Sequence, residues 1–125
     1  MDNNTTEIFE PDHEIRVRTF EFACKVVEFC KELYRQGGVA RQMTPQLIRC
    51  STSIAASLEE ARGAESRPDF ISKCSIGLKE ARESHVRLRV CHRTSIGPRK
   101  PAASSEQSFE TVAVTPAFKW ERLHE

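Results

Sequence analysis

Residues 66–91 read SRPDFISKCSIGLKEARESHVRLRVC and have the clearest periodicity in the chain. Ser66, Pro68 and Asp69 are typical of a helix start: a serine can cap free backbone N–H groups, a proline fits the first turn, and an acid there suits the helix dipole. A row of mostly apolar residues then recurs at spacings of three and four, the period of one helix face. This row contains Ile71, Cys74, Leu78, Ala81, His85 and Leu88. The pattern predicts an amphipathic helix that ends near residue 90 or 91.

Two earlier segments also have a helical period and predict two more helices. The first runs from about residue 15 to residue 35 and ends at Gly37 and Gly38, because glycine tolerates the backbone conformation found at helix C-termini. Its predicted buried stripe contains Val17, Phe20, Cys24 and Val27, with a neighbouring row of Ala23, Cys30 and Tyr34. The second begins at Thr44, the predicted N-cap, with Pro45 in the first turn, and ends at Gly63. Its core row contains Leu47, Cys50, Ile54, Leu58 and Ala61, supported by Ile48 and Ala55.

Length and composition support one all-α domain, an antiparallel helical bundle with three clear helices. The chain has 125 residues, of which 30% are charged and 7% aromatic, a balance that suits helices better than sheets. We divide it into an acidic flexible arm at residues 1–14, a helical bundle domain at residues 15–97 and a Pro- and Ser-containing, poorly ordered tail at residues 98–125. The arm has five acidic residues and no Lys or Arg. The bundle has 15 Lys and Arg against 9 Asp and Glu, so its net charge is +6.

The five cysteines and the hydropathy of the chain point to a reducing compartment and away from a membrane. The cysteine count is odd and no two cysteines form a CxxC pair, so we interpret them as small apolar core residues. The N-terminal residues are acidic and lack the apolar region of a signal peptide. No apolar run approaches the roughly 18 residues of a membrane span. We therefore expect a cytoplasmic protein.

The carboxylates and serines of the predicted helices do not form a catalytic or metal-binding motif. A di-metal helical bundle needs Glu-x-x-His, whereas residues 80–83 read Glu-Ala-Arg-Glu. We expect these acids and Glu59-Glu60 to pair with Arg49, Arg62 and Arg87. The serines have no neighbouring His and Asp partners, and the chain has no glycine-rich phosphate loop. The sequence therefore predicts a protein that is not an enzyme, with no cofactor, no metal and no small-molecule substrate.

One surface of the 66–91 helix is a candidate for binding nucleic acid. Lys79, Arg82, Arg89 and Arg93 lie at helical spacing opposite the core row, together with Ser72, Ser75 and Val86. Cations in such a row can contact successive phosphates of RNA or DNA, in a salt-dependent way. The alternative is an ordinary solvated face, in which Glu83 neutralises Lys79. No aromatic residue interleaves with the row, so we expect no stacking on bases and no sequence-specific recognition.

Residues 43–60, MTPQLIRCSTSIAASLEE, resemble the bacterial family named for intervening sequences in 23S rRNA genes, also called S23 ribosomal proteins. The patterns Ser66-x-x-Asp69-Phe70 and Leu78-x-Glu80-Ala81-x-Glu83 match as well, and the similarity covers about residues 15–97. The resemblance implies an antiparallel four-helix bundle without catalytic activity that forms a homo-oligomer, commonly a pentamer. A related branch, the accessory protein of diversity-generating retroelements, binds nucleic acid and a reverse transcriptase.

The chain departs from this family pattern in two ways. Ser57 and Ala61 stand where the family usually has Asn and Gly. The fourth helix is degraded or missing, because the helical period stops near Arg93 and prolines follow at positions 98, 101 and 116. We hypothesise a truncated or out-of-frame ending.

Two hypotheses about function follow from these observations. In the first, the protein is a non-enzymatic homo-oligomer that associates with RNA or DNA through Lys79, Arg82, Arg89 and Arg93. In the second, it is a protein-interaction scaffold with no nucleic-acid role. Three wide apolar stripes leave apolar surface open when only three helices pack together, and either the tail or another subunit would have to cover it.

Overall fold

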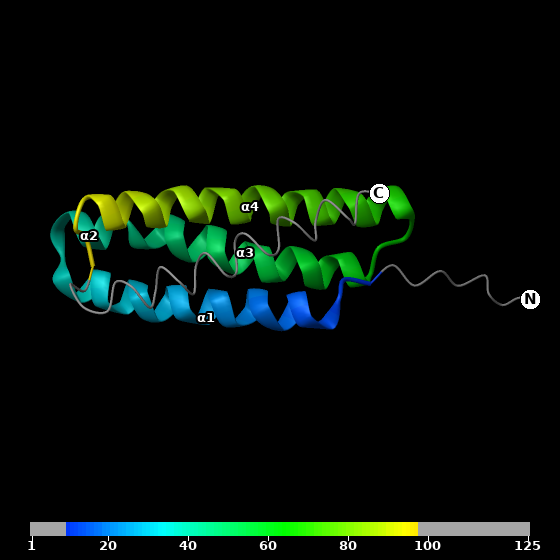
Figure 1. Cartoon of the computed structure of the whole chain (residues 1–125), viewed down its shortest axis with the longest axis horizontal. Helices are drawn as coiled ribbons and strands as arrows, with labels where there is room; N and C mark the ends of the chain where they lie inside the picture. The colour runs from blue at the N-terminus through cyan, green and yellow to red at the C-terminus, as the bar shows by residue number, and fades with distance from the viewer. Residues whose placement is uncertain (1–9, 98–125) are drawn as a thin grey trace, which may run out of the picture.

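The computed structural model describes residues 10–97, which contain three long helices and one short one (Figure 1). Their bounds are α1, His13–Gln36; α2, Gly38–Gln42; α3, Thr44–Arg62; and α4, Arg67–Arg93. The long helices alternate in direction, and no strand occurs in this part of the chain. The predicted all-α antiparallel fold is confirmed. The predicted tail, with the question of a fourth helix, and residues 1–9 of the predicted arm lie outside the described residues.

The helix α3 lies between the other two long helices (Figure 1). It packs along α4 on one side and along α1 on the other, whereas no Cα atom of α1 comes within 8 Å of a Cα atom of α4. This arrangement matters for function, because the exposed faces of α1 and α4 belong to helices whose backbones do not contact each other.

The core consists of apolar residues from all four helices. Leu47, Ile54 and Leu58 of α3 are fully buried, and half of the predicted core row of α4 is buried, namely Cys74, Leu78 and Ala81. Within that row, Ile71, His85 and Leu88 are half-buried. Four of the five cysteines are buried free thiols, which confirms their interpretation as small core residues, whereas Cys24 is exposed. The buried cysteines are Cys30, Cys50, Cys74 and Cys91.

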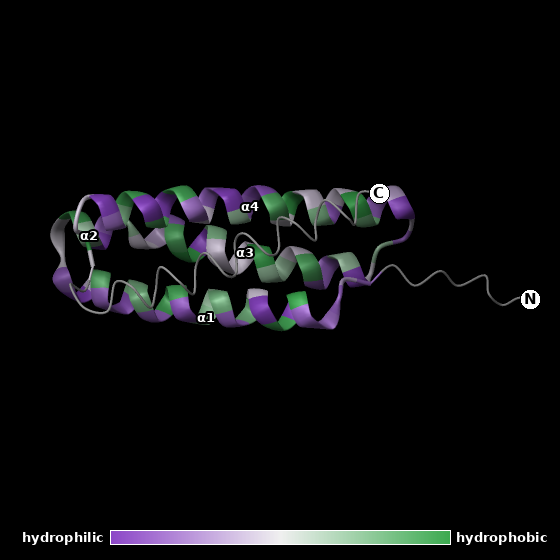
Figure 2. Cartoon of the chain, viewed as in Figure 1, coloured by the Kyte–Doolittle hydropathy of each residue, from purple (hydrophilic) through white to green (hydrophobic). Residues whose placement is uncertain are grey.

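The predicted main row of the buried α1 stripe is wrong, whereas Ala23 and Cys30 of the predicted neighbouring row are buried. Val17, Phe20 and Cys24 are exposed, as is Tyr34 of the neighbouring row, and Val27 is only half-buried. The buried face consists of Ile15, Thr19, Phe22, Ala23, Val26, Cys30 and Leu33. The reason is that α1 has apolar residues on two faces, and only one of these turns toward the core; Figure 2 shows hydrophobic positions on every long helix.

The helix ends follow local capping chemistry with one exception. Ser66 caps α4 as predicted, since its Oγ accepts a hydrogen bond from the Asp69 backbone N–H at 3.2 Å. The helix α1 begins at His13, inside the predicted arm, because Asp12 Oδ1 caps the Glu14 N–H at 2.9 Å. It ends at Gly37, whose φ is +75°.

Thr44 is not an N-cap, contrary to prediction. The short helix α2, which was not predicted, runs almost directly into α3, and the residue between them, Met43, already has helical backbone angles. The Thr44 hydroxyl therefore turns back and donates to the Arg41 carbonyl at 2.9 Å.

Candidate nucleic-acid interface

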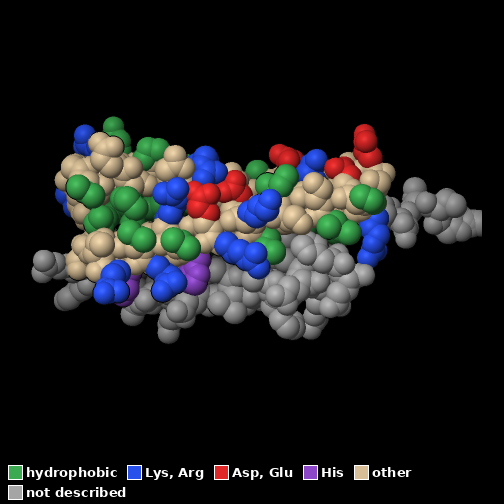
Figure 3. All heavy atoms as spheres, turned by 90° about the horizontal axis from the view of Figure 1, so that it is seen from above, with side chains coloured by type: hydrophobic (Ala, Val, Ile, Leu, Met, Phe, Trp, Pro, Cys, Tyr) green, Lys and Arg blue, Asp and Glu red, His purple; other side chains and the backbone are tan. Residues whose placement is uncertain are grey.

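The four predicted binding residues lie on the outer face of α4, and all four are exposed. Figure 3 looks onto α4 and shows Lys and Arg side chains along this face, with hydrophobic side chains between them. Lys79 and Arg82 are three residues apart, and Arg89 and Arg93 are four apart. At about 1.5 Å of rise per residue, the four positions span about 21 Å of the helix. We call Lys79, Arg82, Arg89 and Arg93 the basic stripe.

The basic stripe lacks carboxylate partners within the described residues. Eight other Lys and Arg side chains in residues 10–97 have a carboxylate oxygen within 4.0 Å. None of the four stripe residues does, nor does Arg67 at the start of α4. Their positive charge therefore remains available to a bound anion.

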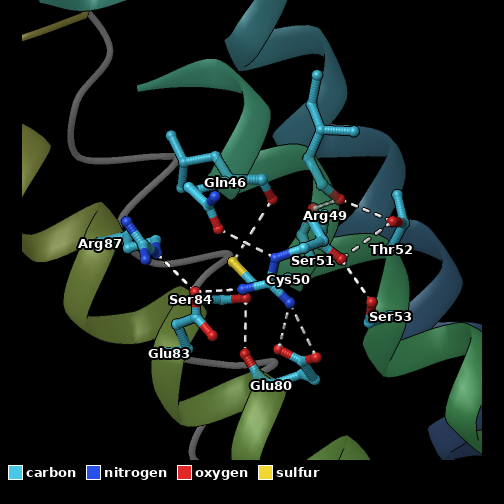
Figure 4. Close-up of polar contacts among 12 residues, drawn as sticks. Gln46, Arg49, Cys50, Ser51, Thr52, Ser53, Glu80, Glu83, Ser84 and Arg87 are labelled. Atoms are coloured by element: carbon cyan, nitrogen blue, oxygen red, sulfur yellow. Dashed lines mark hydrogen bonds and ion pairs between the residues drawn. The ribbon is translucent and has the colours of Figure 1, made fainter. Parts of the chain in front are cut away.

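Two acids of α4, Glu80 and Glu83, pair with arginines outside the stripe (Figure 4). Arg49 of α3 donates through Nη1 to both carboxylate oxygens of Glu80, at 3.2 and 3.1 Å, and through Nη2 to Glu83. Arg87 Nε donates to the same Glu83 oxygen at 2.7 Å. The predicted pairing of these acids with Arg49 and Arg87 is confirmed. The alternative ion pair between Glu83 and Lys79 is not formed.

These hydrogen bonds keep the charges of the network in place. Hydrogen bonds from Arg49, and to a lesser extent from Arg87, hold the pKa of Glu83 below its ordinary value. In turn, the carboxylates of Glu83 and Glu80 raise the pKa of Arg49. The network remains ionised and self-compensated, so it joins α3 to α4 without adding negative charge to the stripe. Sequence reasoning did not show that Arg49 would engage both acids together, because it is 31 and 34 residues away from them.

Aromatic side chains are absent from the exposed surface of α4 in the described chain. Phe70 is buried, and the large exposed aromatics are Phe20 and Tyr34, both on α1, on the far side of α3. The Tyr34 ring already stacks under the Arg41 guanidinium, 4.2 Å from the ring centroid. Within residues 10–97, the large exposed aromatics therefore lie on another helix than the stripe.

The surface next to the stripe has a shallow open groove of about 280 Å³, lined by Met43, Glu83, Val86, Arg87 and Val90. Small-molecule sites need several convergent polar groups, whereas the polar side chains here already pair with each other.

Within residues 10–97, no three His, Cys, Asp or Glu side chains cluster as metal ligands. None of the helices described is long and apolar enough to cross a bilayer.

Comparison with known proteins supports the resemblance noted in the sequence. Residues 11–114 match the family model described as 23S rRNA-intervening sequence protein. The chain is also similar to a crystal structure of a protein with unknown function from the S23 ribosomal protein family of Bacteroides thetaiotaomicron. The two share 31% sequence identity with a TM-score of 0.73, over 86% of this chain and 96% of that chain. No curated protein matches. The family match extends past Gly97, so the first part of the predicted tail falls within the family pattern.

Proposed function

Because the chain belongs to the 23S rRNA-intervening sequence protein family, we propose that it is a non-enzymatic helical-bundle protein that binds the phosphate backbone of RNA or DNA through the basic stripe. The observation that carries this proposal is the uncompensated charge of α4. Most other cations in the described chain sit beside a carboxylate, whereas the four stripe residues share one exposed face without one.

The chemistry of this face suits phosphate contacts. Arginine forms bidentate hydrogen bonds with phosphate oxygens and keeps its charge at any physiological pH, and three of the four stripe residues are arginines. Each contact displaces condensed counterions, which makes the affinity depend steeply on salt. Binding of this kind positions a protein on nucleic acid without reading its sequence.

A homo-oligomer is part of the same proposal. The exposed row on α1, with Val17, Phe20 and Cys24, is an apolar surface of the kind that oligomer interfaces cover. Several copies would present several stripes at once, and linked sites raise the overall affinity without any new contact. Five free thiols fit the cytoplasmic location that we propose, because thiols persist in reducing compartments.

The decisive experiment neutralises part of the stripe and compares an equal charge change elsewhere. The test variant is Arg82→Gln with Arg89→Gln; the control is Lys31→Gln with Arg35→Gln, two cations of α1 that are paired with Glu28 and Glu32. Both variants lose two positive charges from exposed helix positions. Binding of a fluorescent 20-nucleotide RNA hairpin is measured by anisotropy from about 50 to 200 mM salt.

We expect the stripe variant to lose at least tenfold in affinity and about half of its salt slope, and the control to bind like the original protein. Equal losses in both variants would mean that only net charge matters and would refute the stripe as a site. Light scattering at two salt concentrations, with and without RNA, gives the subunit number and tests whether mass is gained only at low salt.

A second candidate function is a protein-interaction scaffold that acts through the α1 row. Exposure of Phe20 favours it, since a large aromatic on an open helix face is typical of protein interfaces. Under this function, Phe20→Ser abolishes partner binding or self-association, and Arg82→Gln with Arg89→Gln changes nothing. The two variants therefore separate the two functions.

A further inference from the structure

We infer that the ligand of the basic stripe is a nucleic-acid duplex rather than a single strand, an inference that rests on the proposed function. The first observation is the spacing of the cations. They form two pairs, Lys79 with Arg82 and Arg89 with Arg93, whose backbone positions are about 4.5 and 6 Å apart along the axis. Between Arg82 and Arg89 the axis rises about 10.5 Å without another cation on this face.

This gap matches a groove. A duplex presents two rows of phosphates along the two edges of each groove, and the B-DNA major groove is about 12 Å wide. One cation pair can contact one row while the other pair contacts the opposite row, and long Arg side chains absorb the difference in width. A single strand presents only one row of phosphates, so it would run across the gap without a partner there.

The residue at the middle of the gap is Val86, which shares the face of the stripe and is 56% exposed. Over a groove no phosphate lies opposite this position, so an uncharged side chain there loses no phosphate contact. At the middle of a single-strand path, it would interrupt the row of cations. The position of Val86 therefore favours the duplex.

The second observation is that, within residues 10–97, no exposed aromatic side chain lies on the helix that carries the stripe. Proteins that bind single strands without sequence preference combine cations with aromatic rings, and each stacked base contributes about 1–3 kcal/mol. The exposed face of α4 has no Phe, Tyr or Trp, and the exposed rings of α1 lie across α3. His85 and His92 of α4 already have interaction partners. Without stacking, an unstructured strand has to be ordered by phosphate contacts alone, whereas a duplex is already rigid.

The test compares four probes with the full chain: a 20-bp RNA duplex, a 20-bp DNA duplex, and the single strands U20 and dT20, which do not fold on themselves. We expect at least one duplex to bind tenfold or more tightly than its single-strand counterpart at about 100 mM salt. Four phosphate contacts predict a slope of log K against log salt of about −3.6 for B-DNA. The RNA and DNA arms identify which duplex the stripe takes.

The possible results separate this inference from the proposed function. Single strands that bind as tightly as both duplexes would overturn the duplex inference and leave the stripe as a general nucleic-acid site. No binding of any probe would overturn the proposed function itself. Binding that survives Arg82→Gln with Arg89→Gln would place the duplex elsewhere on the protein and would also overturn the inference.

A gain-of-charge variant tests the gap directly. Val86→Lys makes the row of cations continuous at an exposed helix position that accommodates lysine well. We expect it to strengthen U20 and dT20 binding more than duplex binding, so that the duplex preference falls by severalfold. The control, Glu60→Gln at an exposed position near the end of α3, changes the net charge by the same +1 and should leave the preference unchanged. Equal gains for duplex and single strand in the Val86 variant would refute the role of the gap.

Discussion

Replacing Phe22 by alanine tests which face of α1 packs in the core. Phe22 is 2% exposed, and Phe20, two residues earlier on the same helix, is 60% exposed. Truncating a buried phenylalanine typically costs about 3–5 kcal/mol, because transfer energy is lost and a cavity remains. Truncating an exposed one usually changes stability by less than about 0.5 kcal/mol. The two Phe→Ala variants remove the same atoms from the same helix, so each serves as the control for the other.

The expected difference is large enough for a simple measurement. For a domain of this size, 1 kcal/mol shifts Tm by roughly 4–8 °C, so a loss of 3 kcal/mol for Phe22→Ala lowers Tm by roughly 12–24 °C. Urea unfolding followed by circular dichroism at 222 nm gives the free energies for both variants. The curves should be recorded at two protein concentrations, because subunit association adds a concentration-dependent term.

Equal destabilisation by both variants at the lower protein concentration would refute the observed orientation of α1. A Phe20→Ala effect that appears only at the higher concentration is a different result. It would leave the core face intact and place Phe20 in an interface between copies, as the proposed oligomer requires.

Four further predictions concern two glycines, a helix cap and the thiols. Gly97→Ala should destabilise the protein more than Gly37→Ala in urea unfolding. Both glycines have a positive φ, +114° at Gly97 and +75° at Gly37, so both variants strain the backbone. A Cβ atom at position 97 would also lie 2.7 Å from an aromatic carbon of α1, whereas one at position 37 has no atom within 4 Å. Ser66→Ala should cost about 1 kcal/mol in the same assay, through loss of the α4 cap. Ellman's reagent should titrate Cys24 first in the folded protein. Burial, helped by neighbouring thiols, raises the pKa of Cys30 from 9.0 to about 12, so only the unfolded chain releases this proton near pH 9. Stability should be fully present below pH 9 and decline as the pH rises toward 12, measured as a falling urea midpoint; a midpoint that rises over this range would contradict the assignment.

The sequence was most informative where local chemistry decides the structure. The end of α3 at Gly63 and the capped start of α4 at Ser66 were predicted correctly, because capping and glycine preferences act over a few residues. The helix α2 was missed because five residues, GVARQ, are too few to display a period. That short helix also explains the error at Thr44, whose preceding backbone is already helical.

The face of α1 illustrates a different limit. Spacings of three and four identify an apolar stripe, but α1 has two such stripes, one with Phe20 and one with Phe22. Periodicity shows that each stripe is continuous along the helix, and it contains no information about which one meets α3. Choosing between them requires the contacts themselves.

For this protein, the sequence alone determined the three long helices, most of their ends and the order of cations along α4, because the geometry of one helix places residues three and four apart on one face. The sequence predicted that these acids pair with Arg49 and Arg87, but only the tertiary structure showed that Arg49 engages Glu80 and Glu83 at the same time. Only the tertiary structure, too, placed the exposed aromatics of α1 on a helix whose backbone does not contact that of α4. The reason is physical: these relations depend on contacts between helices far apart in the chain, and the spacing of residues within one helix does not encode them.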